Sequence, residues 1–119
     1  MPASAHWIRR VAAFALLACA GGAAIAAEGG YPSKHIRLII PYAPGGGVDA
    51  AGRLLAQQFG GLLEQQVIVE NRPGGASVIG TTAVVNAPAD GYSLLLISVA
   101  IVTNQSLIKN ISYDPVRDL

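Results

Sequence analysis

An apolar run that breaks into prolines and then into three glycines constrains this chain more than any other stretch. Residues 36–49 read IRLIIPYAPGGGVD, and leucines at helical spacing follow. A short apolar run, a glycine-rich break and a helical pattern predict a strand, a tight loop and a helix in that order. The sequence therefore predicts an α/β fold in which this loop leaves the end of a strand.

The same loop is a candidate binding site for an anion. The first backbone amides of a helix have no partner inside the helix, and together with the helix dipole they favour a negative charge. Gly45, Gly46 and Gly47 have no side chains that would keep a ligand away from these amides. A plain strand-to-helix turn is the alternative, but three adjacent glycines are more than one turn needs. Asp49 follows at a position where a carboxylate suits the dipole.

Residues 1–26 have the pattern of a secretory signal peptide. Arg9 and Arg10 precede an apolar run, and residues 24–26 (AIA) form a small-residue cleavage site. The run is shorter than the roughly 20 apolar residues that span a bilayer. The residues LLAC, which end at Cys19, are an alternative processing site that would leave a lipid anchor on the cysteine. We therefore expect export to the periplasm, with residues 27–119 as the mature part.

Composition excludes several classes of function. The chain has 8 Lys and Arg against 7 Asp and Glu, and removal of Arg9 and Arg10 leaves 6 against 7. A near-neutral chain without a basic patch is not suited to nucleic acid. The single cysteine lies in the predicted signal, so we expect no disulfide and no cysteine metal site in the mature part. We find no metal-ligand spacing and no nucleophile motif, and we assign no catalytic residue, metal or cofactor.

The mature part alternates between strand and helix patterns. We expect strands at 36–40, 66–70 and 92–98, and helices at 49–59 and 78–87, with 99–107 helical or irregular. Leu54, Leu55 and Phe59 should form the apolar face of the first helix, Gly60 and Gly61 should end it, and Ser77 should cap the second. Such alternation predicts an open parallel sheet, in which ligands bind beyond the carboxyl ends of the strands.

Two alternatives remain open on the residues alone. Residues 45–50 fit the dinucleotide pattern G-x-G-x-x-A, and Glu70 is an acid at the end of the next strand. Prolines separate the strand from the first glycine, however, and a secreted protein rarely meets a soluble dinucleotide. The other alternative is a secreted enzyme whose catalytic groups lie in sequence beyond these residues.

Several blocks together resemble one known family. YPSK at 31–34, IRLIIPYAPGGGVD, VIVENRPGG, ADGYSLLL, Asn104 and SYDPVRDL occur in an order and spacing similar to those of the Bug-family receptors. These are the periplasmic solute-binding components of tripartite tricarboxylate transporters. The resemblance covers essentially the whole mature chain and implies a periplasmic binding-protein fold that closes on a small carboxylate for delivery to membrane permease subunits.

The resemblance also implies which residues bind the ligand. One arm of the site would be the loop after the first strand with its aspartate, and the other the segment after the third strand. Val99 is bulkier and more apolar than the resemblance implies for its position. The implied ligand-binding residues are Ala43, Pro44, Gly45, Gly46, Gly47, Asp49, Ser98, Val99 and Ala100.

The resemblance implies a second lobe, which these residues do not include. We therefore expect this chain to hold an incomplete first lobe only, and to bind a carboxylate weakly or not at all when alone, because high affinity requires most of the ligand surface to be buried.

Overall fold

A computed structural model describes residues 30–119, so the predicted signal peptide and Cys19 lie outside the described part of the chain. Three parallel strands form one sheet in the order β2-β1-β3. The central strand is β1 (Ile36–Ile40), with β2 (Val67–Asn71) and β3 (Ser93–Leu95) on either side of it. Leu38 is paired with Val69 on one side and with Leu94 on the other. The α/β class and the open parallel sheet are confirmed.

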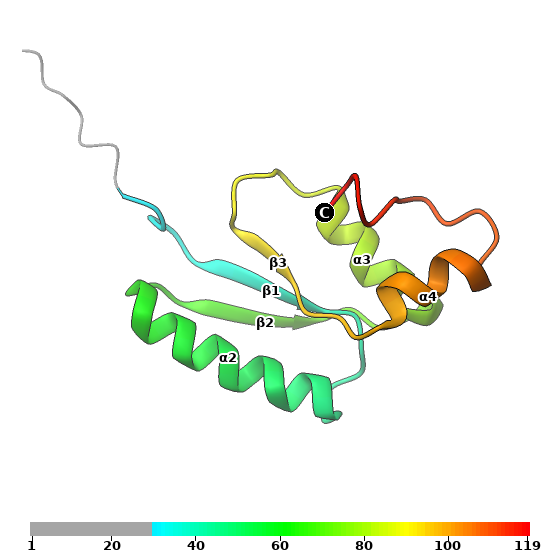
Figure 1. Cartoon of the computed structure of the whole chain (residues 1–119). Coiled ribbons are helices and arrows are strands. Elements are labelled where there is room, and N and C mark those ends of the chain that lie inside the picture. Colours follow the sequence, from blue (N-terminus) through cyan, green and yellow to red (C-terminus); the bar gives the residue numbers. More distant parts are fainter. Residues whose placement is uncertain (1–29) are drawn as a thin grey trace, which may run out of the picture.

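Helices cover both faces of the sheet (Figure 1). One face carries α2 (Gly47–Leu63), which packs on β1 and β2, and the other carries α3 (Val78–Val85), which packs on β1 and β3. A short 3-10 helix, η1 (Gly75–Ser77), precedes α3 and contacts α4 (Ala100–Leu107). Residues 99–107, for which the sequence predicted a helix or an irregular segment, are thus helical over most of their length.

The core is built on β1 because this strand has a neighbour on each edge and a helix on each face. Ile36, Ile39 and Ile40 are all 1% exposed or less. On the α2 face, Leu38 and Ile40 pack with Ala56. An almost continuous apolar strand is the pattern expected of a parallel strand that is covered on both sides.

The predicted apolar face of the first helix is wrong. Leu54, Leu55 and Phe59 are 65%, 38% and 37% exposed, whereas the buried residues of α2 are Asp49, Gly52 and Ala56. Gly52 lies so close to Ile40 and Leu96 that a Cβ atom at this position would overlap them. Small residues let α2 lie close to the sheet, and this close approach decides which face is buried.

Element boundaries also differ from the predictions. Gly60 and Gly61 do not end α2, which continues to Leu63 and ends at Glu64 in a left-handed conformation (φ 51°). The second strand runs one residue further than predicted, to Asn71, and the third is confined to Ser93–Leu95. In α2, the amide hydrogen bonds of Gly60 and Gly61 outweigh the weak helix propensity of glycine.

A glycine holds α3 against the ends of two strands. A Cβ atom at Gly80 would lie 2.7 Å from the Pro41 Cβ and 2.8 Å from the Arg72 carbonyl oxygen. Pro41 follows β1 directly and Arg72 follows β2 directly. The start of α3 is therefore fixed beside the loops that leave the carboxyl end of the sheet.

Candidate functional site

The first glycine loop, residues 43–47, leaves β1 and leads into α2. Its residues are exposed, and Gly45 has a φ of +87°, a conformation that favours glycine. The N-cap of α2 is Gly46, and no side chain caps the helix. Gly47, the first residue of α2, is therefore exposed at a helix end that no side chain caps, as the anion hypothesis requires.

Asp49 supports this loop from inside. Its side chain is only 5% exposed. Its Oδ2 accepts hydrogen bonds from the Gly45 amide at 2.9 Å and from Arg53 Nε at 3.0 Å. Its Oδ1 accepts one from Asn71 Nδ2 at 2.9 Å. Asp49 is thus bonded to the protein on both oxygens, and its predicted contact with a ligand remains a prediction.

These bonds connect three elements at one point. Asn71 Nδ2 also donates to the Tyr42 carbonyl at 3.1 Å, and Arg53 Nη2 donates to Asn71 Oδ1 at 3.2 Å. The end of β1, the start of α2 and the end of β2 are thereby tied together. Arg53, with the Gly45 amide and the Asn71 side chain, lowers the pKa of Asp49 to about 2. Asp49 is therefore ionised at neutral pH, and Arg53 balances its charge.

The segment after β3 meets the loop after β1 through Tyr42. The hydroxyl oxygens of Tyr42 and Ser98 lie 2.6 Å apart, and the Ser98 amide donates to the Tyr42 hydroxyl at 3.3 Å. Ser98 Oγ also accepts from the Ala100 amide, at the start of α4, at 3.4 Å. The structure thus brings the two predicted arms, which are more than fifty residues apart in sequence, to one place.

That place is the topological switch point of the sheet. The chain passes from β1 outward to β2 and then crosses to β3 on the other side of β1. At a point of this kind, loops that leave neighbouring strands lead in opposite directions, and open α/β sheets bind their ligands there. The first glycine loop, which follows β1, and Ser98, which follows β3, both lie at this switch point.

The second glycine loop, residues 71–77, lies beneath α4. Asn104 is buried, and its Nδ2 donates to the Ala76 carbonyl at 2.6 Å and to Ser77 Oγ at 3.1 Å. Ser77 occupies the N-cap position of α3 in a left-handed conformation and makes no side-chain cap hydrogen bond, so its predicted capping role is wrong. Its hydroxyl instead helps to hold α4.

Charged side chains near the loops are paired. Arg72 Nη2 lies 3.1 Å from Glu70 Oε2, and Arg37 Nε lies 2.6 Å from Glu70 Oε1. Hydrogen bonds from Arg37 lower the pKa of Glu70. An acid bound by two arginines is poorly placed to hold a ribose hydroxyl, so the geometry weighs against the dinucleotide alternative.

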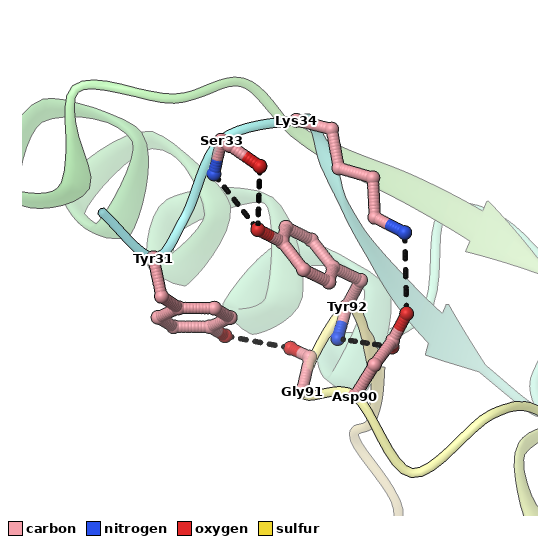
Figure 2. Close-up of polar contacts among 6 residues, drawn as sticks. All are labelled: Tyr31, Ser33, Lys34, Asp90, Gly91 and Tyr92. Atoms are coloured by element: carbon pink, nitrogen blue, oxygen red, sulfur yellow. Dashed lines mark hydrogen bonds and ion pairs between the residues drawn. The ribbon is translucent and has the colours of Figure 1, made fainter. Parts of the chain in front are cut away.

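A second polar cluster lies at the opposite, amino end of the sheet (Figure 2). The Tyr31 hydroxyl donates to the Gly91 carbonyl at 2.7 Å, and the Ser33 amide donates to the Tyr92 hydroxyl at 2.8 Å. Lys34 Nζ lies 3.1 Å from Asp90 Oδ2. This amino-end cluster joins the segment before β1 to the turn before β3, and it contains no residue predicted to bind a ligand.

A cavity of about 510 Å³ lies between α2 and β2, away from the predicted site. Its lining includes Gln57, Gln66 and Val69, and Arg53 is its one charged residue. The residues that line this cavity include neither Ser98 nor any residue of the first glycine loop. We do not regard it as the site, because Arg53 already balances Asp49.

Within residues 30–119, no group of three or more His, Cys, Asp or Glu side chains is placed to hold a metal ion. In the same part of the chain, no helix has the length and apolar character needed to cross a membrane.

Sequence reasoning missed the side chains that assemble the loops. Tyr42, Asn71 and Arg53 were not predicted as site residues, although Asn71 ends β2 and Tyr42 is the second residue after β1. Polar residues at the carboxyl ends of parallel strands are the available signal. Their partners depend on strand order, which alternation alone does not reveal.

Comparison with known proteins places the chain among transport receptors. Residues 51–119 match the family described as the tripartite tricarboxylate transporter family receptor. BugT of Bordetella pertussis is 41% identical over 105 residues, which are 87% of this chain and 32% of BugT. An Agrobacterium vitis protein of the UPF0065 group is 39% identical over 92 residues, or 77% of this chain and 27% of that protein.

Solved structures agree with this match. The periplasmic binding protein BugD is 41% identical with a TM-score of 0.69, over 71% of this chain and 28% of BugD. MatC from Rhodopseudomonas palustris, solved with bound malate, is 26% identical with a TM-score of 0.65, over 74% of this chain and 30% of MatC. An R. palustris protein solved with adipate is 29% identical with a TM-score of 0.68, over 72% of this chain and 29% of that protein. The chain spans between 26% and 36% of the length of the curated relatives it matches.

Proposed function

Because this chain belongs to the Bug receptors of the tripartite tricarboxylate transporter family, we propose that it forms part of a periplasmic receptor that binds a small carboxylate for its transporter. Matched structures are described as periplasmic binding or solute-binding proteins rather than enzymes. We therefore do not retain the secreted-enzyme alternative. Delivery of the carboxylate to membrane permease subunits is part of the proposal.

The proposed site is the switch point of the sheet, where the first glycine loop and the segment that starts at Ser98 come together. One observation carries it: the Tyr42 and Ser98 hydroxyls, 2.6 Å apart, join the loops from β1 and β3 where open α/β sheets bind ligands. In this proposal a ligand carboxylate accepts hydrogen bonds from the uncapped first amides of α2, including that of Gly47. Adipate and malate in two matched structures make a carboxylate a reasonable class for this site.

Gly47 offers a clean test of the amide donors. It is the first residue of α2, where proline is well tolerated, and Gly46 before it is extended (φ −80°, ψ 169°), as a residue before proline prefers. Gly47→Pro removes the N–H group while keeping the helix. Gly47→Ala is the matched control, because it keeps the N–H group and its Cβ atom meets nothing within 4 Å.

We would measure binding in a chimera in which this chain replaces the matched residues of BugT, called the BugT chimera below. Calorimetry with adipate and malate should show that Gly47→Pro binds about 10- to 100-fold more weakly, the loss expected for one hydrogen bond to a charged group. Gly47→Ala should bind within about twofold of the parent. Equal affinity of the two variants, both shown to be folded by thermal unfolding, would contradict a role for this amide.

A further inference from the structure

One polar side chain anchors α4 to the rest of the described chain. Asn104, at 5% exposed, is the only residue of α4 that residues 30–119 bury. Its Nδ2 donates to the Ala76 carbonyl at 2.6 Å and to Ser77 Oγ at 3.1 Å. Because Asn104 is already enclosed, these two bonds do not depend on what covers the rest of α4 in a complete receptor.

The turn that accepts these bonds is strained. Ala76 and Ser77 have φ values of 52° and 76°, in the left-handed region that residues other than glycine rarely adopt. Such a conformation persists only where the surrounding contacts hold it. Thr81 Oγ1 donates to the Ser77 carbonyl at 2.9 Å from within α3, and Asn104 bonds to the same turn from α4. Contacts from two helices therefore hold this turn.

Ser98 is bonded into the first turn of α4, so its position depends on that helix. Its carbonyl accepts from the Ile101 amide at 3.3 Å, and its Oγ accepts from the Ala100 amide at 3.4 Å. Asn104 lies about one helical turn after Ala100. A buried amide bonded to two specific acceptors fixes a helix in one position. The anchor at Asn104 therefore sets where Ser98 meets Tyr42.

The first glycine loop has a separate anchor. Asp49 accepts hydrogen bonds from the Gly45 amide and from Asn71, and none of these groups takes part in the bonds of Asn104. The two sides of the proposed site are thus held by different buried polar residues, and a change at one anchor leaves the other in place.

We propose that Asn104 is a positioning residue of the carboxylate site. It does not touch the ligand, but by fixing α4 on residues 76 and 77 it holds Ser98 beside Tyr42 in the conformation that binds. Loss of its side-chain amide therefore weakens binding. The inference rests on the proposed function, because it requires the segment that starts at Ser98 to contribute to the site.

Two variants remove the amide donor of Asn104. Asn104→Asp keeps the size of the side chain but has no hydrogen to donate when it is ionised. Asn104→Ala removes the donor without adding a charge. Gln105→Ala is the matched control, because it also removes an amide side chain, from the next residue of α4, which is exposed in this chain.

Affinity is measured by calorimetry with adipate and malate in the BugT chimera, after thermal unfolding has established that each variant is folded. Both Asn104 variants should bind about three- to thirtyfold more weakly than the parent, as for residues that act on a site without touching its ligand. Gln105→Ala should bind within about twofold of the parent.

Hydrogen–deuterium exchange of the chimera separates positioning from a general loss of stability. In the Asn104 variants the amides of residues 98–107 should exchange faster than in the parent, whereas those of residues 43–50 should be unchanged. Saturating adipate should slow the exchange of residues 98–107 more in the variants than in the parent, because the ligand selects the conformation that Asn104 no longer holds. A contact that only stabilises the fold would show no such compensation.

The outcomes separate the two proposals. If the parent chimera binds and Gly47→Pro weakens binding, but both Asn104 variants bind within about twofold of the parent, the inference is overturned and the proposed function stands. Weaker binding without faster exchange at residues 98–107, or faster exchange that adipate does not slow, would also overturn the inference. If neither adipate nor malate binds to the parent chimera, the proposed function is overturned and the inference falls with it.

Discussion

The two ends of the sheet are held by different kinds of contact. At the carboxyl end, Asp49 is almost fully buried and connects the first glycine loop with α2 and β2. At the amino end, the contacts of Tyr31 and Lys34 with the turn before β3 are exposed to water. Buried charge-assisted hydrogen bonds contribute more than exposed ones, so the carboxyl end should be the stiffer of the two.

The largest effect is expected where α3 touches the carboxyl end. Gly80→Ala places a methyl group within 3 Å of the backbone at Pro41 and Arg72, so α3 must move away from the strand ends. We expect a loss of up to about 3 kcal/mol in the free energy of unfolding, as for overpacked cores. Urea denaturation measures it.

Gly61→Ala is the control for this substitution. Gly61 lies within α2, and an added Cβ atom meets nothing within 4 Å. This variant should gain about 0.5–1 kcal/mol from better helix propensity. A Gly80→Ala protein as stable as the parent would show that the contact at the carboxyl end is not tight.

A smaller but clear loss is expected when Asp49 loses its charge. Asp49→Asn keeps the size of the side chain but weakens its bonds to the Gly45 amide, Arg53 and Asn71. The melting temperature should fall, and the amides of the first glycine loop should exchange faster with solvent. Asp90→Asn at the amino end is the matched change, and it should lower the melting temperature less. A larger fall in melting temperature for Asp90→Asn than for Asp49→Asn would contradict the contrast between the two ends of the sheet.

The same carboxylate gives the carboxyl end a pH dependence. Its pKa in the folded chain, about 2, lies below the ordinary value of 3.8. A lowered folded pKa means that the contribution is complete above about pH 4 and is lost as the pH falls toward 2. Asp118, whose pKa is also lowered to about 2, chiefly by Arg117, acts in the same range.

Measuring stability at a series of acid pH values tests this pH dependence. Denaturation midpoints measured between about pH 5 and pH 2 should fall less steeply in Asp49→Asn than in the parent, with the Asp118 contribution remaining. An unchanged slope would mean that the Asp49 charge does not stabilise the fold.

The smallest effect is expected at the amino end. Tyr31, a residue that is 59% exposed, donates a hydrogen bond to the Gly91 carbonyl, and Tyr31→Phe removes this bond while the ring stays beside Tyr92. We expect a loss of about 0.5–1 kcal/mol, which is the usual net value of one hydrogen bond. Thermal unfolding should show this loss without any change in carboxylate affinity in the BugT chimera, and altered affinity would mean that the two ends are coupled.

Sequence patterns predicted the parts of this fold that depend on neighbours along the chain. The apolar run at 36–40 predicted the strand β1, and the glycines predicted loops at the carboxyl edge. Sequence patterns did not predict that α2 would bury Gly52 and Ala56 and leave Leu54 exposed. Which face of a helix is buried depends on how closely the helix approaches the sheet. Sequence patterns also left open whether β3 pairs with β1 or with β2.

In the candidate site, too, some residues were predicted from local patterns, whereas their contacts depend on how the strands pair. Residues of the first glycine loop were predicted from local features, namely glycines at the entrance to a helix. The meeting of Tyr42 with Ser98 depends on β3 being placed beside β1, a contact across 56 residues that local patterns do not encode. Asp49 was expected near the helix start, but its bonds to Asn71 and Arg53 required the paired strands.

Under the proposed function, the bond between Asp49 and the Gly45 amide has a consequence for the rate of ligand capture. A loop already held by its own carboxylate does not have to be ordered by the arriving solute, so little conformational entropy is lost at encounter. We therefore expect the on-rate to depend mainly on diffusion and on any closure of the complete receptor, and differences in residence time to come from how fast the solute escapes.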